Sequence, residues 1–369
     1  MSRARDFADL AGSADAGGLT GRNMLINGQH LISQRGTTFS ETTAASYTTD
    51  RWLRHVGSSF NFDTTITQST TVPAGTGLTH SLKVEADAAV TPSGSDNAGI
   101  GQRIEGDTMK RLAYGAATGK SATLSFWVRS NKTGTYCVMF GMNNGSSTSS
   151  EKYLHVKEYT ISSADTWEHK TILLPANTTQ AITTSTSEGF RIVWWLAVGS
   201  SDHVSADSWI QSDSFSATSN QVNFMDSASN EWYLTGCQFE IGEQATPFEH
   251  RSFGDELRRC QRYFVNYPDT SDGTNIVFVG RGNGTSQISN CNFPMPVVMR
   301  ASPTFSTIAS LNAIGPSGYN NATNVTPTVQ GTPTFEPNLG VSFTGLSGLT
   351  DNRLAGAYIF SPFSINAEL

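Results

Sequence analysis

The feature that most constrains the fold is a succession of short apolar segments, bounded by turn residues, that begins near Asn23 and ends near Ile241. In Ser121–Ser130 and Gly189–Gly199, apolar residues occupy alternate positions, which is the period of a β-strand with one buried face. Such segments recur about ten times over roughly 230 residues, without any helical pattern of comparable length. We therefore expect a β-sandwich.

Length and charge limit the number of domains and the class of partner. The chain has 369 residues, enough for two domains that each bury a core. Its net charge of -7 gives no basic surface for nucleic acid, so we expect no nucleic-acid partner. No apolar run reaches the length of a membrane span, and the first residues lack the apolar block of a signal peptide. We expect no membrane insertion and no export signal.

A second β-pattern follows Phe264 and ends in alternating apolar residues from Phe363 to Leu369. The intervening segment 312–337 is rich in Asn, Pro, Thr and Gly, and we expect either long loops or a contact surface for a neighbouring chain. The predicted fold class is all-β, with a β-sandwich joined by a short helix to a second, smaller β-sandwich. The predicted parts are a flexible N-terminal arm (1–22), the first sandwich (23–250), the connecting helix (251–264) and the C-terminal β-domain (265–369).

The connection between the two β-regions is the stretch from Trp232 to Phe264. A predicted strand comes first, and Ala245-Thr246-Pro247 then forces an extended exit, because the residue before a proline avoids the helical region. The helix that follows has its acidic residues first and its arginines last, which suits the helix dipole. Leu257, Cys260 and Phe264 form one narrow apolar stripe. We expect this stripe to pack in a small interface, between domains or around an oligomer axis.

The N-terminal segment 1–22 differs from the rest of the chain. Phe7 and Leu10 fall at helical spacing, and a Gly-rich stretch follows them. An amphipathic segment this short cannot bury its apolar face alone. Two interpretations remain open: a disordered terminus, or an arm that becomes ordered only against another protein.

Two strand faces carry the candidate ligand-binding residues. Trp127 and Arg129 share one face of their strand, and Arg191 and Trp195 share one face of theirs. A pyranose ring stacks on an indole, while Arg, Asn and Asp pair with its hydroxyls, so these residues suit a glycan if the faces are open. The alternative is that loops or a neighbouring subunit cover them. Four other tryptophans are assigned to the core: Trp52, Trp167, Trp194 and Trp232.

Other chemistry lacks a recognisable pattern in the sequence. The seven histidines show no metal-ligand spacing, and we expect no metal and no cofactor. No serine or cysteine stands in a nucleophile motif, and no pair of carboxylates can be nominated for glycoside hydrolysis, so we expect no enzyme activity. The four cysteines form no Cys-x-x-Cys pair, and we expect reduced, mostly buried thiols.

A set of segments carries a family resemblance through its order and spacing. The segments are N-M-L-I-N-G-Q-H-L-I-S-Q-R-G-T-T-F (23–39), Y-T-T-D-R-W (47–52), Q-R-I-E-G (102–106), L-S-F-W-V-R-S (124–130), C-Q-F-E-I-G-E-Q-A-T-P-F-E-H-R-S-F-G-D-E-L-R-R-C-Q-R-Y-F (237–264), F-P-M-P-V-V-M-R-A-S-P-T-F (293–305) and the closing N-A-E-L. Together they resemble bacteriophage tail-fibre and related virion structural proteins, whose modules are similar to carbohydrate-binding modules. The resemblance implies a jelly-roll sandwich, a connecting helix and a smaller β-domain.

The same resemblance implies a function. We expect a virion protein, a tail fibre that attaches to a host cell-surface glycan, assembled in the host cytoplasm as a homo-oligomer, a homotrimer. Residues 1–22 would anchor it to another virion protein. The alternative is a head fibre or capsid decoration protein without a receptor role. A polysaccharide-degrading tailspike is the third hypothesis, and the resemblance brings no catalytic motif with it.

Overall fold

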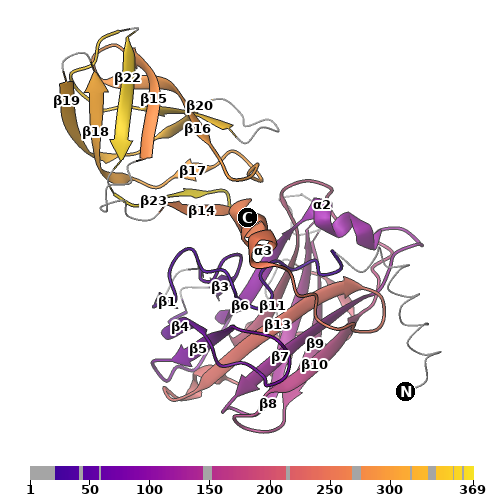
Figure 1. Cartoon of the computed structure of the whole chain (residues 1–369). Helices are drawn as coiled ribbons and strands as arrows, with labels where there is room; N and C mark the ends of the chain where they lie inside the picture. Colours follow the sequence, from indigo (N-terminus) through magenta and orange to yellow (C-terminus); the bar gives the residue numbers. More distant parts are fainter. Residues whose placement is uncertain are drawn as a thin grey trace. The chain divides into compact units, whose positions relative to one another are not determined.

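The chain divides into two compact units. The first contains Met1–Phe253 together with Leu369, and the second contains Gly254–Glu368. The division falls inside the predicted connector, at the start of its helix. The computed structural model describes residues 21–40, 45–57, 60–143, 152–212, 217–267, 276–315, 318–330, 338–351, 353–359 and 361–369 (Figure 1). Phe7 and Leu10, and with them residues 1–20 of the predicted arm, lie outside these residues.

The first unit contains two sheets, and every pairing between its named strands is antiparallel. The six-stranded sheet has the order β1 (Thr38–Phe39), β4 (Thr64–Ser69), β5 (Ser81–Ala86), β13 (Glu231–Ile241), β7 (Ala122–Ser130) and β10 (Glu168–Leu174). The seven-stranded sheet has the order β12 (Trp209–Gln211), β9 (Lys152–Ile161), β8 (Gly134–Asn143), β11 (Glu188–Val198), β6 (Asn97–Glu105), β3 (Leu53–Gly57) and β2 (Ser46–Tyr47).

Both sheets contribute side chains to one core. In β7, Leu124, Phe126 and Val128 are fully buried in it, as their alternation predicted. Trp52, Trp194 and Trp232 are 0% exposed, so their assignment to the core is confirmed. Two packed sheets around one core are a β-sandwich, and the predicted all-β, jelly-roll class is confirmed.

Helical segments are short in the first unit. They are α2 (Gly106–Met109) and the 3-10 turns η1 (Lys110–Leu112), η3 (Ser200–Asp202) and η4 (Phe224–Asp226). In the parts of the chain that the structure describes, no helix is long and apolar enough to cross a membrane.

Strand β13 contains a bulge that explains its imperfect alternation. Its pairing with β7 shifts between Thr235 and Gln238, and Gly236 has a φ of 61°, in the left-handed region that favours glycine. One extra residue at this point reverses the alternation. Leu234 before the bulge and Cys237 after it therefore both face the core, although they are three positions apart.

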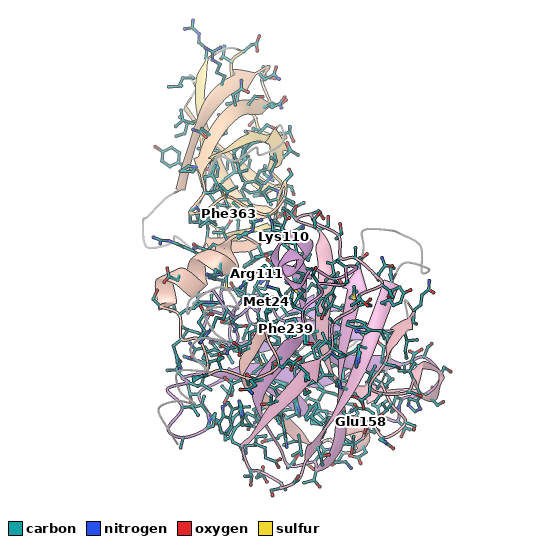
Figure 2. The ribbon with its side chains drawn as sticks, turned by 90° about the vertical axis from the view of Figure 1, so that its right-hand side faces the viewer. Met24, Lys110, Arg111, Glu158, Phe239 and Phe363 are labelled. Atoms are coloured by element: carbon teal, nitrogen blue, oxygen red, sulfur yellow. The ribbon has the colours of Figure 1, made fainter. Side chains whose placement is uncertain are left out.

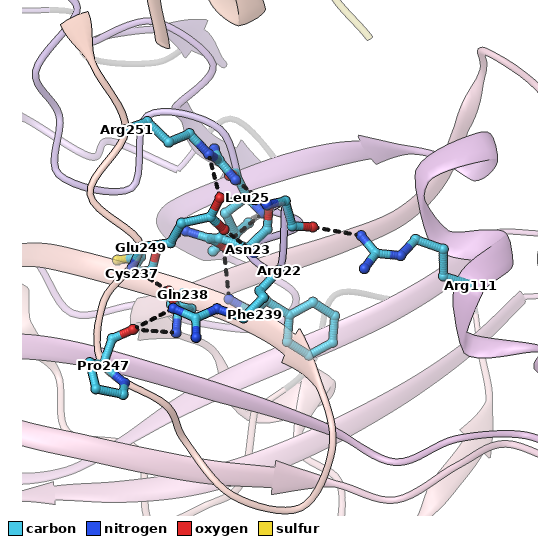
Figure 3. A network of polar contacts seen from close by, with 11 residues as sticks. Arg22, Asn23, Leu25, Arg111, Cys237, Gln238, Phe239, Pro247, Glu249 and Arg251 are labelled. Atoms are coloured by element: carbon cyan, nitrogen blue, oxygen red, sulfur yellow. Dashed lines mark hydrogen bonds and ion pairs between the residues drawn. The ribbon is translucent and has the colours of Figure 1, made fainter. Parts of the chain in front are cut away.

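The start of the first unit is tied to β13 by the side chain of Asn23 (Figure 3). The Asn23 amide donates to the Cys237 carbonyl (2.9 Å), and its Oδ1 accepts from the backbone N–H groups of Leu25 (3.0 Å) and Phe239 (3.0 Å). The backbone N–H of Met24 donates to the Phe239 carbonyl at 2.8 Å (Figure 2). The Asn23 side chain thus provides hydrogen-bond partners for three buried backbone groups that strand pairing leaves without one.

A glutamate and an arginine extend this tie to the segment that leaves the sandwich. The Glu249 carboxylate accepts from the N–H groups of Gly21 (2.7 Å) and Asn23 (2.8 Å). Arg251 donates to the carbonyls of Asn23 and Leu25 and lies 3.5 Å from Glu249. We call Asn23, Glu249 and Arg251, with the strand β13 that they contact, the clasp.

Gly28 allows the segment that follows Asn23 to lie close to β13. The Cys237 N–H donates to the Gly28 carbonyl at 2.8 Å, and a Cβ on Gly28 would lie 2.2 Å from the Cys237 carbonyl oxygen. Any larger residue would therefore force the two backbones apart.

A polar segment covers the outer face of the seven-stranded sheet. Residues 199–212 and 217–222 contain β12 and the Ala217 bridge to His203, and they lie over outward-facing residues of β8, β9 and β11. The cluster buried there consists of Cys137, Met139, Leu154, Val156, Val193, Trp195, Val198 and Ala217.

The second unit begins with α3 (Phe253–Gln261), whose first residue still counts with the first unit. The predicted stripe is only partly correct: Cys260 is fully buried and Leu257 partly buried on the helix, but Phe264 is not helical. The helix ends at Gln261. Phe264 instead begins strand β14, where it is buried and pairs with Asn366.

Two sheets also enclose the core of the second unit. The smaller has the order β14 (Phe264–Tyr267), β23 (Phe363–Asn366) and β17 (Thr304–Phe305). The larger has the order β19 (Gly318–Val325), β18 (Ile308–Gly315), β22 (Leu354–Ile359), β15 (Ile276–Asn283), β16 (Gln287–Pro294), β21 (Asn338–Phe343) and β20 (Thr328–Gln330). The second β-sandwich is confirmed.

Part of the second unit corrects the sequence prediction. The segment 312–337 is not simply long loops, because it contains the end of β18 and all of β19 and β20. Strands β19 and β20 are the two edges of their sheet, where polar side chains such as Asn321 meet solvent. Polar edge strands protect a sheet from unwanted pairing, which accounts for the misleading composition.

The cysteines are buried and reduced, as predicted. None of Cys137, Cys237, Cys260 and Cys291 forms a disulfide. Burial raises the pKa of Cys237 well above its ordinary value and raises that of Cys291 to about 11. These thiols are therefore protonated at neutral pH.

Two buried histidines make the fold sensitive to acid. Burial, with a smaller contribution from neighbouring charge, lowers the pKa of His30 and of His55 to about 3. In the unfolded chain both titrate near 6.5, so below that pH only the unfolded state takes up protons. Their contribution to stability is complete above pH 6.5 and is lost as the pH falls toward 3.

We expect the free energy of unfolding to fall by about 1 kcal/mol per pH unit per histidine below pH 6.5. Urea unfolding at a series of pH values measures the slope. His30→Asn should reduce it, since Asn tolerates the positive φ of 54° at this position and does not titrate. The exposed His203→Asn is the control, and an unchanged slope in His30→Asn would contradict the argument.

We expect Asn23→Ala to destabilise the protein by about 3 kcal/mol, because it leaves three buried backbone groups without their partner. Chemical denaturation measures the loss, and Asn61→Ala, at an exposed asparagine, is the matched control. Equal stabilities of the two variants would show that the clasp does not hold the first unit together.

Candidate functional site

The outer face of the six-stranded sheet carries a group of aromatic and charged side chains around Trp127. Strand pairing places Trp127 directly opposite His169 on β10 and Thr235 on β13. The rings of Trp127 and His169 have centroids 5.0 Å apart with a tilt of 51°. Trp127 is partly exposed and His169 is exposed, so this pair of rings reaches solvent.

Arg129 lies two residues along β7 and is fixed from two directions. Its guanidinium lies 4.9 Å from the ring centroid of Tyr233, which is the partner residue on β13. Its Nη2 and Nε donate to the Oδ1 and the carbonyl oxygen of Asp165, both at 3.0 Å. A guanidinium with this many contacts is held in one orientation before any ligand arrives.

Lys83 on β5 approaches Tyr233 and joins two carboxylates. Its Nζ lies 5.6 Å from the ring centroid of Tyr233, 2.7 Å from Glu85 and 3.0 Å from Glu231. The Tyr233 hydroxyl donates to Glu231 at 2.9 Å, and Trp167 meets the Tyr233 ring edge-on, with centroids 6.0 Å apart. We call the set Lys83, Trp127, Arg129, Trp167, His169, Glu231 and Tyr233 the Trp127 face.

These ion pairs hold the charged groups ionised. Burial alone would lower the pKa of Lys83 and raise that of Glu231, but the hydrogen bonds from Lys83 to Glu85 and Glu231 outweigh burial. The pKa of Lys83 is therefore raised and that of Glu231 lowered, so both stay charged around neutral pH. Partial burial lowers the pKa of His169, which leaves its ring neutral at pH 7.

Residues that follow β13 cover one part of this sheet face. They fold back so that Thr123 donates to the Gly242 carbonyl (2.7 Å) and Gln238 donates to Thr246. Leu78, which is 6% exposed, lies against Gly236 beside the Trp127 indole. The Trp127 face lies on the part of the sheet that these segments leave uncovered, as does Leu173 on β10, which is 41% exposed.

For Trp195 the structure shows the alternative, a face covered by loops. Trp195 is 0% exposed, because residues 199–212 and 217–222 fold over the outer face of its sheet. Arg191, on the same strand, is mostly buried and pairs with Glu188, which also lies 3.4 Å from Arg103. The structure therefore does not bring Arg191 and Trp195 together with Trp127 and Arg129, and places them on the other sheet.

Several members of the Trp127 face escaped the sequence prediction. Trp167 was assigned to the core, but it is partly exposed, because it immediately precedes β10 at the edge of the sheet. Trp167 and His169 are separated by one residue, the spacing at which side chains share a strand face. That spacing was a usable signal. Tyr233 and Lys83 gave none, since they come from different strands.

Among the described residues, no group of three or more His, Cys, Asp or Glu side chains is arranged to hold a metal ion.

Comparison with known proteins gives only distant matches. No protein-family model and no curated protein matches the sequence. The enzymatically active domain of tailspike protein 4 from bacteriophage CBA120 matches with a TM-score of 0.29 and 12% identity, over 60% of this chain and 21% of that one. This chain thus spans about a fifth of the tailspike domain.

Carbohydrate-binding modules match with similar scores. The CBM22-2 xylan-binding domain from Paenibacillus barcinonensis has a TM-score of 0.31 and 12% identity, over 52% of this chain and 92% of that one. The family 11 module from Clostridium thermocellum, in complex with a β-1,3-1,4-mixed-linked tetrasaccharide, has a TM-score of 0.27 and 11% identity, over 57% and 98%. TM-scores below 0.5 support no inference about function, which must come from the side chains of this chain.

Proposed function

We propose that the Trp127 face binds a glycan. The observation that carries the proposal is the indole of Trp127, which reaches solvent beside the neutral ring of His169 on the outer face of the six-stranded sheet. An exposed pair of rings with fixed polar groups around it suits a ligand that has both an apolar face and hydroxyls. A pyranose ring has both.

The polar groups around the rings suit sugar hydroxyls. Arg129 offers N–H donors, while Asp165 and Glu231 offer carboxylate oxygens, and all three are held by contacts to one another or to Tyr233. Because these groups are positioned before a ligand arrives, binding carries little entropic cost for ordering their side chains. The face would therefore fix the orientation of a sugar that stacks on Trp127.

We further propose that the protein binds glycan without cleaving it. Glycoside hydrolysis needs a carboxylic acid that stays protonated near neutral pH as well as a carboxylate. Glu231 has the opposite property, since its hydrogen bonds to Lys83 and Tyr233 lower its pKa. The Glu231 carboxylate would thus serve as a hydrogen-bond acceptor.

We expect Trp127→Ala to weaken glycan binding at least about tenfold, because it removes the stacking surface. The measurement is calorimetric titration with purified bacterial surface polysaccharides that bind the unaltered protein. Phe253→Ala is the matched control, since Phe253 is a 59% exposed aromatic residue outside the face. Equal affinities for all three proteins would place the glycan site elsewhere.

The biological role of this binding activity is proposed from the sequence resemblance to phage tail fibres. On this proposal the protein is a homotrimeric tail fibre, anchored to another virion protein by residues 1–22, and its Trp127 face attaches to a host cell-surface glycan. The head-fibre alternative uses the same modules but needs no receptor contact.

We expect antibody fragments against the first unit to block adsorption of the phage to its host, because a tail fibre must contact the receptor. The measurement counts free phage after mixing with cells, and fragments against the major capsid protein are the control. If adsorption continues while the fragments are bound to the particle, the protein is a head or decoration protein.

A further inference from the structure

Each cation of the Trp127 face is already neutralised within the protein. Arg129, with a side chain 21% exposed, lies 3.0 Å from Asp165, and Lys83, 19% exposed, lies 2.7 Å from Glu85 and 3.0 Å from Glu231. Two cations therefore meet three carboxylates, which leaves a net charge of -1 on this group.

The strands on either side add no unpaired positive charge among the described residues. On β10, Lys170 pairs with Glu168 at 2.5 Å, and His169 is neutral at pH 7 because burial lowers its pKa. On β4, the outward-facing residues opposite Lys83 and Glu85 are Thr67 and Thr65. Thr65 donates to Asp87 at 2.8 Å, which adds a further carboxylate at this side.

The carboxylates are the more accessible partners in these pairs. The side chain of Asp165 is 58% exposed, and those of Glu85 and Glu231 are 35% and 34% exposed, whereas both cations are about half as exposed or less. A ligand that approaches the face therefore meets oxygen acceptors before it meets the cations. The hydroxyl groups of a sugar can donate to these acceptors, but a carboxylate or phosphate group on the sugar would be repelled by them.

We infer that the Trp127 face selects neutral glycans and discriminates against sugars that carry carboxylate, sulfate or phosphate groups. The inference rests on the proposed function, because it names the ligand class of the same site. An anionic sugar would have to break the pairs that hold Arg129 and Lys83, and one carboxylate would remain uncompensated in any case. A neutral sugar uses the face without disturbing them.

The test uses the full chain and a panel of purified bacterial polysaccharides of known composition, neutral and anionic, of matched length. We expect the neutral members to bind in a Trp127-dependent manner, with affinities that change less than about twofold between about 50 mM and about 500 mM NaCl. Trp127-dependent binding that prefers anionic members and weakens with salt would overturn the inference while leaving glycan binding at this face intact. Binding that does not depend on Trp127, or no binding to any member, would instead overturn the proposed function.

A charge variant provides a second, independent reading. Glu85→Gln removes one of the two carboxylates that neutralise Lys83 and leaves the other in place. We expect it to raise the ratio of the affinity for anionic polysaccharides to the affinity for neutral ones at least about threefold. Glu243→Gln, at an exposed position on the turn after β13, makes the same change in net charge and should leave that ratio unchanged. Equal effects of the two variants would mean that overall charge, not the pairing of Lys83, decides selectivity.

Discussion

The hydrogen bonds of the Asn23 side chain join the segment around Asn23 to β13, a strand that lies more than two hundred residues later in the sequence. Because β13 lies between β5 and β7, what fixes it also fixes its neighbours. Tyr233, on the same strand, is the residue against which Arg129 and Lys83 are held. The Trp127 face thus depends on the closure of the sandwich.

The charged groups of the Trp127 face form a network that is already satisfied. Lys83, Glu231 and Tyr233 contact one another, and Arg129 is held between Tyr233 and Asp165. Surface ion pairs contribute little to stability, so the value of this network lies in positioning. It keeps long side chains from covering Trp127 and presents fixed donors and acceptors beside it.

Much of the fold was predictable from alternation, since Leu124, Phe126 and Val128 face the core as their spacing requires. The candidate site was only half predictable. Trp127 and Trp195 occupy equivalent positions in strands of mixed faces, and nothing local distinguishes them. The difference is made by residues 199–212 and 217–222, which are polar, come later in the sequence than Trp195 and cover it. Composition also misled in the second unit, where polar edge strands resemble loops.

The single extra residue at Gly236 divides β13 into two halves, and the alternation of core-facing and outward-facing residues shifts by one position between them. Even-numbered residues face the core before it and odd-numbered residues face the core after it, as Leu234 and Phe239 do. A position-by-position comparison with another jelly-roll strand that lacks the bulge will therefore match surface positions with core positions along one half. For a chain whose relatives are distant, a gap placed at this glycine decides whether a real similarity in β13 is visible or lost.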